Sequence, residues 1–123
     1  MASKSTPLNQ LPPALPKGTV VWRAVPSGAA ALAKDAKRWM PVSATAEGAE
    51  AWAVHNLVGG RTTICKIVVA GSRVRALAVG SDADYEAEKE ILIAPGFKAS
   101  RTGEAHLPTA AGNEVVCFKI VGP

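Results

Sequence analysis

The sequence predicts an α+β domain in which helices come early and short strands dominate the later part of the chain. After residue 61, short apolar runs are separated by glycine and proline, as in a series of strands. The chain has 123 residues, of which 48% are hydrophobic and 20% charged, so it has globular composition and enough length for one hydrophobic core. We therefore expect one domain built around packed sheets.

The beginning of the chain is expected to contain a tail, a strand and a helix. Met1–Lys17 holds four of the nine prolines and shows little periodicity, which predicts a tail or linker before a domain that spans residues 18–123. The apolar run Thr19–Val25 is predicted as the first strand. A proline–serine pair then forms a helix start signal, so an alanine-rich helix is expected at about Gly28–Arg38.

A second helix is expected around Trp52. Ser43 closes a short strand, and Thr45 is placed to cap the helix, with Glu47 in an acidic first turn. Three- and four-residue spacing puts Trp52 on the packed side, and a glycine pair at 59–60 ends the helix. Plain capping is the alternative to a ligand role for Ser43 and Thr45.

The rest of the chain is predicted to form five strands, because glycine or proline interrupts a succession of apolar runs. The strands are expected at Thr62–Val69, Val74–Leu77, Glu90–Ile93, Phe97–Arg101 and Glu114–Val121.

One charged side chain interrupts the first strand. Arg23 stands between Trp22 and Ala24, and an arginine among apolar neighbours is seldom buried without a partner. Its fork of donors suits a pyrophosphate or a carboxylate. The alternatives are an edge-strand arginine that faces solvent and an arginine paired with a nearby acid.

Two glutamates lie two residues apart where the strand at 90–93 begins. If the chain is extended there, Glu88 and Glu90 point to one side and Lys89 to the other. Like charges on one face repel each other, and one reason to keep them is sugar chemistry, in which a carboxylate stabilises an oxocarbenium-like carbon. The alternative is a polar turn with solvated glutamates that leads into a buried strand.

Taken in this order, the segments resemble the arginine-serine-glutamate branch of the mono-ADP-ribosyltransferase family. The first mark is an apolar strand with a central arginine, here Arg23. The second is a Ser-Thr-Ser-like strand end followed by a helix with a buried aromatic, here Ser43-Ala44-Thr45 and Trp52. The third is Glu-x-Glu before an apolar strand and Pro-Gly, here from Glu88 to Gly96. The resemblance covers roughly residues 19–121, and the chain departs from the serine motif at positions 44 and 45.

This resemblance implies a split two-sheet β-sandwich with short helices and a dinucleotide cleft between the sheets. It also implies an enzyme that uses NAD as its substrate, without a metal, and transfers ADP-ribose to a protein. Arg23 would hold the pyrophosphate, Ser43 would orient the nicotinamide ribose, and Glu90 would stabilise the cationic sugar carbon. Glu88 would deprotonate the acceptor, and a glutamate at that position implies an arginine acceptor.

Two aromatic residues have two interpretations each. Tyr85 lies where relatives often carry an aromatic that touches the target protein, and ordinary loop packing is its alternative. Trp52 is a candidate for binding the cofactor in the cleft, whereas its helical spacing favours core packing.

Three function classes follow. The first is a transferase of the toxin or effector kind, whose partners would be a target protein and an immunity or activator protein. The second is an NAD glycohydrolase toxin, in which water is the acceptor. The third is a non-catalytic interaction module that keeps the fold. Glu88 favours the transferase, because hydrolysis does not need a base to activate a guanidinium.

The net charge and the positions of the histidines indicate which ligands and partners the chain suits. The formal net charge is +4 with a pI near 9.3, a modest basic balance that suits an anionic dinucleotide or an acidic protein. Basic residues are not clustered among aromatic ones, so nucleic-acid binding is not expected. His55 and His106 are isolated in the sequence, and no metal-ligand spacing occurs.

The cysteines and the hydropathy pattern bear on the compartment. Cys65 and Cys117 lie in apolar runs and are expected to be buried, with a bridge between adjacent strands as the alternative. The chain has no run of about 18 apolar residues and no apolar segment of the signal-peptide kind. We therefore expect a cytoplasmic protein, or a secreted effector that acts in the cytosol of a target cell.

Overall fold

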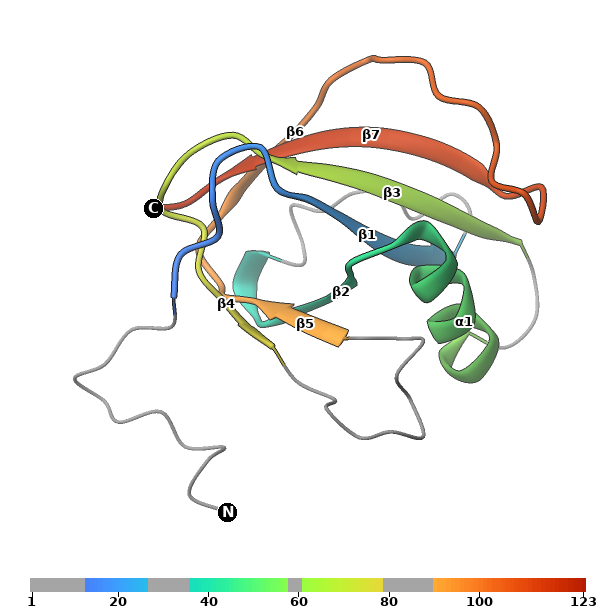
Figure 1. Cartoon of the computed structure of the whole chain (residues 1–123), viewed down its shortest axis with the longest axis horizontal. Coiled ribbons are helices and arrows are strands. Elements are labelled where there is room, and N and C mark those ends of the chain that lie inside the picture. Colours follow the sequence, from blue (N-terminus) through green and yellow to red (C-terminus); the bar gives the residue numbers. More distant parts are fainter. Residues whose placement is uncertain (1–12, 27–35, 58–60, 79–89) are drawn as a thin grey trace.

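The computed structural model of the chain describes residues 13–26, 36–57, 61–78 and 90–123. Within these ranges the chain forms seven strands and one α-helix, so the protein is a sheet-rich α+β fold (Figure 1). The elements are β1 (Val20–Pro26), β2 (Met40–Ser43), α1 (Ala46–Asn56), β3 (Thr62–Val69), β4 (Ala76–Ala78), β5 (Glu90–Ile93), β6 (Lys98–Arg101) and β7 (Glu114–Val121).

The strands form one mixed sheet in the order β4-β5-β2-β1-β3-β7-β6. Neighbouring strands are antiparallel except β3 and β7, which run parallel. The last strand of the chain, β7, lies between β3 and the edge strand β6, so the C-terminal strand lies inside the sheet.

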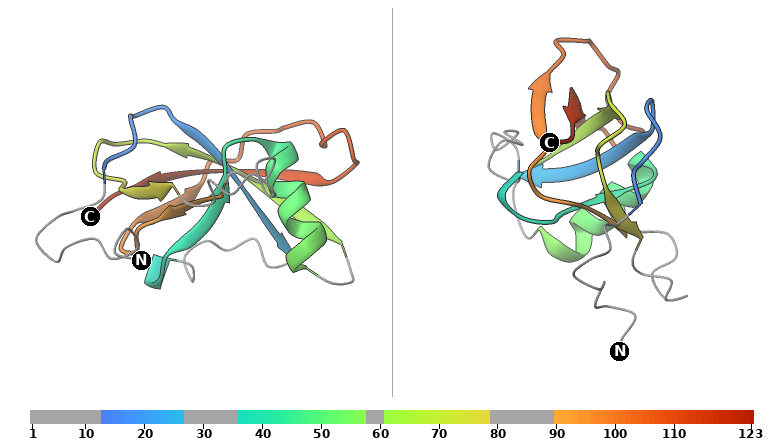
Figure 2. Two further views of the ribbon diagram at one scale, coloured as in Figure 1. Left: turned by 60° about the horizontal axis from the view of Figure 1, so that its bottom comes forward. Right: turned by 90° about the vertical axis from the view of Figure 1, so that its left-hand side faces the viewer.

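The sheet is nearly divided between β1 and β2. Seven residue pairs join β1 to β3, whereas a single pair, Trp22 with Ser43, joins β1 to β2. The strands therefore fall into two groups, β4-β5-β2 and β1-β3-β7-β6, that diverge from this contact (Figure 1 and Figure 2).

The main core lies between these two groups. On β1, Val21 and Val25 face it, and alternate residues of β3 and β7 do the same because strand side chains alternate between faces. Their partners across the core come from the smaller group and from the segments next to it. The buried residues of this cluster include Cys65, Ile67, Val69, Val116, Phe118 and Ile120 on one side and Met40, Val42, Val74, Ala76, Ile93 and Phe97 on the other.

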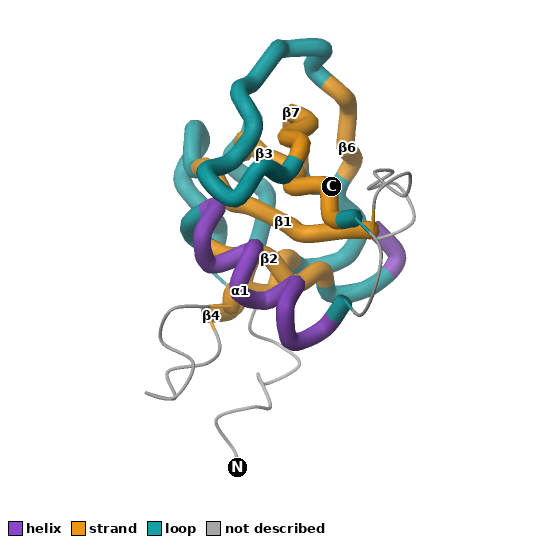
Figure 3. Tube along the Cα trace, turned by 90° about the vertical axis from the view of Figure 1, so that its right-hand side faces the viewer, coloured by secondary structure: helices purple, strands orange, loops and turns teal. Residues whose placement is uncertain are grey.

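The helix α1 covers the opposite face of β1 and β3 (Figure 3). Ala49 and Ala53 are buried against Ala24 and Ile64, and the small alanine side chains let the helix approach the sheet closely. Because β3 has the helix on one face and the main core on the other, it carries buried residues on both faces, with Ile64 on the helix side and Cys65 and Ile67 on the core side.

Most predicted elements are confirmed, and α1 begins as expected. Thr45 is extended, and its side chain accepts a hydrogen bond from the backbone N–H of Gly48 at 2.9 Å, which is the N-cap geometry. The strands predicted at 62–69, 90–93 and 114–121 have the bounds that the sequence indicates. The helix predicted at 28–38 lies almost wholly outside the described residues.

The strand predicted at Val74–Leu77 begins later, at Ala76. The backbone before it is occupied by the end of the proline-rich segment, since the N–H of Leu15 donates to the carbonyl of Val74 and the N–H of Ala76 donates to the carbonyl of Pro13. Leu15 also packs against the main core. Residues 13–16 thus lie against β4.

The two cysteines are buried and form no disulfide bond. Cys65 pairs with Val116 across β3 and β7, so Cys117, the next residue of β7, points to the other face of the sheet. A bridge between them is therefore excluded by the register, and both residues act as small core side chains.

Candidate functional site

The register of three strands places one residue of each in a row. Ser43 of β2 pairs with Trp22 of β1 on one side and with Glu90 of β5 on the other. Side chains of directly paired residues share a face, with Cβ atoms about 4.5–5.5 Å apart. The row Trp22–Ser43–Glu90 therefore brings together two of the sequence-predicted site residues. Arg23 is the next residue of β1, and strand alternation directs its side chain to the other face of the sheet, the face of Val21 and Val25.

Ser43 is the buried member of the row. It is 3% exposed at the end of β2, and none of the residues that the structure describes forms a hydrogen bond with its hydroxyl. A buried polar group without a partner is uncommon and calls for a reason, such as a ligand. Glu90, beside it, is half-buried at the first position of β5.

Arg23 lies at the point where β1 and β2 diverge. Its Nη1 donates a hydrogen bond of 2.9 Å to the carbonyl oxygen of Pro41, two residues before Ser43 on β2. Where two strands stop pairing, backbone carbonyls lose their usual donors, and the guanidinium supplies one. Arg23 therefore has a structural role in this fold, and that role holds its guanidinium next to the serine-bearing strand.

The helix α1 closes a narrow crevice over this end of β2. The crevice is lined by Trp22, Arg23, Ala24, Pro41, Val42, Ser43, Ala49 and Trp52, and it is too narrow to admit a water molecule. Trp52 also packs against the smaller core cluster beneath the helix. The packing role expected for Trp52 is confirmed, and its side chain lines the same crevice as Ser43.

The loop between β6 and β7 reaches this region from the far end of the sequence. The ring of His106 meets the indole of Trp22 edge-on, with centroids 5.9 Å apart and an interplanar angle of 79°. Sequence reasoning missed His106, because a single histidine in a polar loop carries no spacing or periodicity that predicts its contact with a strand residue.

Two predicted site residues have no described position. Glu88 and Tyr85 lie in the segment 79–89, outside the described residues. Their roles as acceptor base and target-contacting aromatic remain sequence-based predictions.

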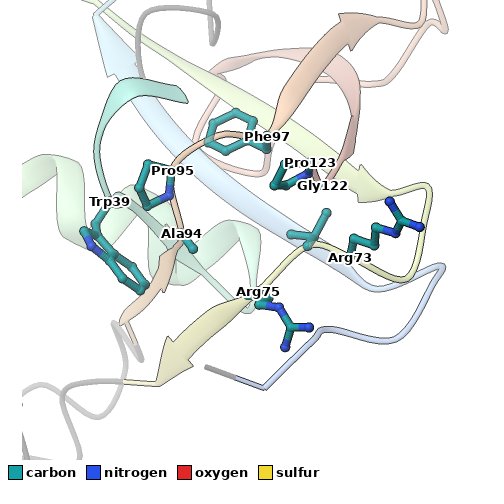
Figure 4. Close-up of a pocket in the computed structure, with 9 residues that line it drawn as sticks. Trp39, Arg73, Arg75, Ala94, Pro95, Phe97, Gly122 and Pro123 are labelled. Atoms are coloured by element: carbon teal, nitrogen blue, oxygen red, sulfur yellow. The ribbon is translucent and has the colours of Figure 1, made fainter. Parts of the chain in front are cut away.

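A cavity more spacious than the crevice at the end of β2 lies elsewhere among the described residues. It has a volume of about 570 Å³ and is lined by residues from the other ends of β2 and β5, among them Trp39, Ala94 and Phe97. Four residues of β5 span about 10 Å, so this cavity is separated from the row by the length of the strand. Arg73 and Arg75 line it too, but Figure 4 shows their side chains extending away from Trp39 and Pro95.

We assign the candidate site to the row rather than to this cavity. The side chains that line the cavity include no carboxylate, hydroxyl, imidazole or thiol, whereas the row carries a side-chain carboxylate and a buried hydroxyl. Space alone binds ligands, but bond cleavage needs groups that stabilise charge or move protons.

Among the described residues, no three histidine, cysteine, aspartate or glutamate side chains are grouped to hold a metal ion. No helix within the described ranges is both long and apolar enough to cross a membrane.

Comparison with protein-family models, with curated proteins and with solved structures finds no match to this chain. The functional interpretation therefore depends on the residues of the site and their geometry.

Proposed function

We propose that this chain is a mono-ADP-ribosyltransferase with the split-sheet fold of that family, and that it cleaves NAD at the end of β2. The observation that carries the proposal is the register that sets Ser43 between Trp22 and Glu90. Arg23 follows Trp22 on β1, and its guanidinium reaches β2 at the carbonyl of Pro41. These residues are far apart in the sequence, and their types suit the pyrophosphate, the ribose and the cationic sugar carbon of one dinucleotide.

In this proposal Arg23 binds the pyrophosphate. Its bond to the carbonyl of Pro41 fixes the side chain before the ligand arrives. A fixed donor loses less conformational entropy on binding than a free one. Ser43, whose hydroxyl is buried, positions the nicotinamide ribose next to Glu90.

Glu90 stabilises the transition state for cleavage. The bond between the ribose carbon and the nicotinamide nitrogen breaks, and its electron pair leaves with nicotinamide. The carboxylate of Glu90 faces the positive charge that develops on the ribose carbon, and partial burial strengthens that interaction. A guanidino nitrogen of the acceptor then bonds to this carbon, and Glu88 takes the proton that it loses.

The activity implies a target protein with an accessible arginine. For an effector delivered into a target cell, it also implies an immunity or activator protein that controls the enzyme. Water in place of the arginine would make the same site an NAD glycohydrolase.

The test is the fate of NAD labelled on its adenylate part, incubated with the full-length protein and a cell lysate. We expect label on protein, and Glu90→Gln should reduce both cleavage and labelling on the order of 10²-fold, because the amide keeps the shape but lacks the charge. Glu47→Gln is the matched control, since Glu47 is exposed on the first turn of α1. Unchanged turnover in Glu90→Gln would contradict the proposal.

A second variant in the same assay separates transfer from hydrolysis. Glu88→Gln should abolish protein labelling and leave much of the release of free ADP-ribose, because only the acceptor step needs a base. Brisk hydrolysis without labelling by the wild type would assign the chain as an NAD glycohydrolase. No cleavage by the wild type would leave a non-catalytic interaction module.

A further inference from the structure

The cavity at the far ends of β2 and β5 has no part in the proposed chemistry. Its volume of about 570 Å³ is large enough for a small organic molecule, since pockets that hold such ligands measure about 300–1,000 Å³. Its lining is mostly apolar with a few polar groups, as in such pockets. The cavity therefore has the size and the lining of a binding site.

One end of the cavity is aromatic. Figure 4 shows Trp39 and Pro95 on the same side of it. Phe97 and Val74 are buried and form part of its apolar wall. The indole of Trp39 is 39% exposed, although large apolar side chains are usually covered. A flat, partly exposed indole offers a surface on which the ring of a ligand can stack.

The other end of the cavity is positively charged. Arg73 and Arg75 flank the buried Val74, and their side chains extend away from Trp39 and Pro95 (Figure 4). A guanidinium keeps its charge at any ordinary pH, and no acidic side chain lines the cavity. Two cationic groups beside an apolar wall attract an anion.

The backbone that carries the two arginines is held from two directions. A Cβ atom on Gly122 would overlap the carbonyl group of Arg73, so the end of the chain packs directly against this backbone. From β5, the N–H of Ala94 donates a hydrogen bond of 2.8 Å to the carbonyl of Arg75. The shape of the cavity is thus set before a ligand binds, which lowers the entropy cost of binding.

We propose that this cavity binds a small organic anion with an aromatic body, its ring against Trp39 and its charged group near Arg73 and Arg75. A small molecule fits better than an extended peptide, because residues 13–16 already form backbone hydrogen bonds with Val74 and Ala76. The inference goes beyond the proposed function and does not depend on it. The ligand would bind at a second site and would not be cleaved there.

The test uses two fluorescent probes with similar aromatic bodies. Anilinonaphthalene sulfonate carries a negative charge, and phenylnaphthylamine is neutral. Each is titrated into the full-length protein. We expect Arg73→Gln to weaken binding of the sulfonate on the order of three- to tenfold and to leave binding of the neutral probe unchanged. Trp39→Ala should weaken binding of both probes, because both rings lose the indole.

Arg61→Gln is the matched control for Arg73→Gln. Both arginines are exposed, but Arg61 precedes β3 at the end of the sheet far from Gly122, roughly 26 Å away along the strand. This control should bind both probes as the wild type does. An equal loss of sulfonate affinity in Arg61→Gln would mean that the net charge of the protein, and not the cavity, attracts the probe.

Three results would overturn the inference. The first is sulfonate binding that Arg73→Gln does not change, and the second is sulfonate binding that Trp39→Ala does not change. The third is displacement of the sulfonate by NAD in the Glu90→Gln variant, which would make the cavity the dinucleotide site. We expect NAD and the sulfonate to bind this variant together, since about 10 Å of β5 separates the two sites.

Discussion

The two sides of β1 differ in how they are joined to the rest of the sheet. Toward β3, seven residue pairs and several buried apolar side chains make a regular contact. Toward β2, one pair remains, and polar groups from three strands gather around it. Where strands stop pairing, backbone groups need other partners, as the carbonyl of Pro41 does, and we propose that the site lies at this break in the sheet.

The two sides of β1 also differ in the residues they contribute, core residues on one side and candidate site residues on the other. The side of β1 that faces β3 and β7 supplies much of the main core, including residues that are fully buried. The side that faces β2 holds a buried hydroxyl without a described partner and an arginine that replaces strand pairing. We therefore expect substitutions on the two sides to affect different measurements.

The largest effect on stability is expected on the β3 side. Ile67 is 0% exposed in the middle of the main core, so Ile67→Ala should lower the free energy of unfolding by about 2–5 kcal/mol through lost burial and a cavity. Urea titration measures this change, and the Michaelis constant for NAD of the folded fraction should stay the same. A loss below about 1 kcal/mol would show that this side is not the main source of stability.

Arg23 is expected to affect both measurements. Arg23→Ala removes the donor to Pro41 and the proposed pyrophosphate contact, so it should weaken NAD binding about tenfold or more and also lower stability by about 1 kcal/mol. Arg23→Lys should restore stability better than affinity, because an amine lacks the bidentate fork. Calorimetry and urea titration together check this. Unchanged affinity in Arg23→Ala would make the residue purely structural.

The smallest effect on stability is expected at Ser43. Removing a buried hydroxyl that has no described partner should leave the free energy of unfolding within about 0.5 kcal/mol of the wild type, or raise it, because the desolvation penalty disappears. NAD cleavage should nevertheless fall by about tenfold if Ser43 orients the ribose. A Ser43→Ala variant that is much less stable and fully active would reverse the comparison between the two sides of β1.

The sequence was sufficient for the elements that carry a strong local signal. The strand bounds at 62–69 and 114–121 follow from long apolar runs, and Thr45 caps α1 because a hydroxyl before an acidic turn is a clear signal. The end of β5 before Pro95-Gly96 could be predicted from the sequence for a similar reason. Gly96 has a φ of 96°, a conformation that glycine adopts easily.

The contacts between distant segments could not be predicted in this way. The single pair between β1 and β2, the parallel pairing of β3 with β7 and the contact of His106 with Trp22 depend on the folding of the whole chain. The carbonyl partner of Arg23 was not foreseen either, because sequence reasoning weighed only anions, solvent and a nearby acid as its environment. Local sequence patterns predict which residues are candidates, whereas the pairing of distant strands determines which of those residues lie close together.

The most direct test of the central claim is the position at which NAD binds. The measurement is the change in backbone amide NMR signals of the ¹⁵N-labelled Glu90→Gln protein as NAD is added. We expect the largest shifts at Trp22, Arg23 and Ser43, and none at Trp39, Ala94 and Phe97 beside the larger cavity, which is about 10 Å away along β5. Shifts confined to the cavity residues, or no shifts with saturating NAD, would contradict the assignment of the site to the break between β1 and β2.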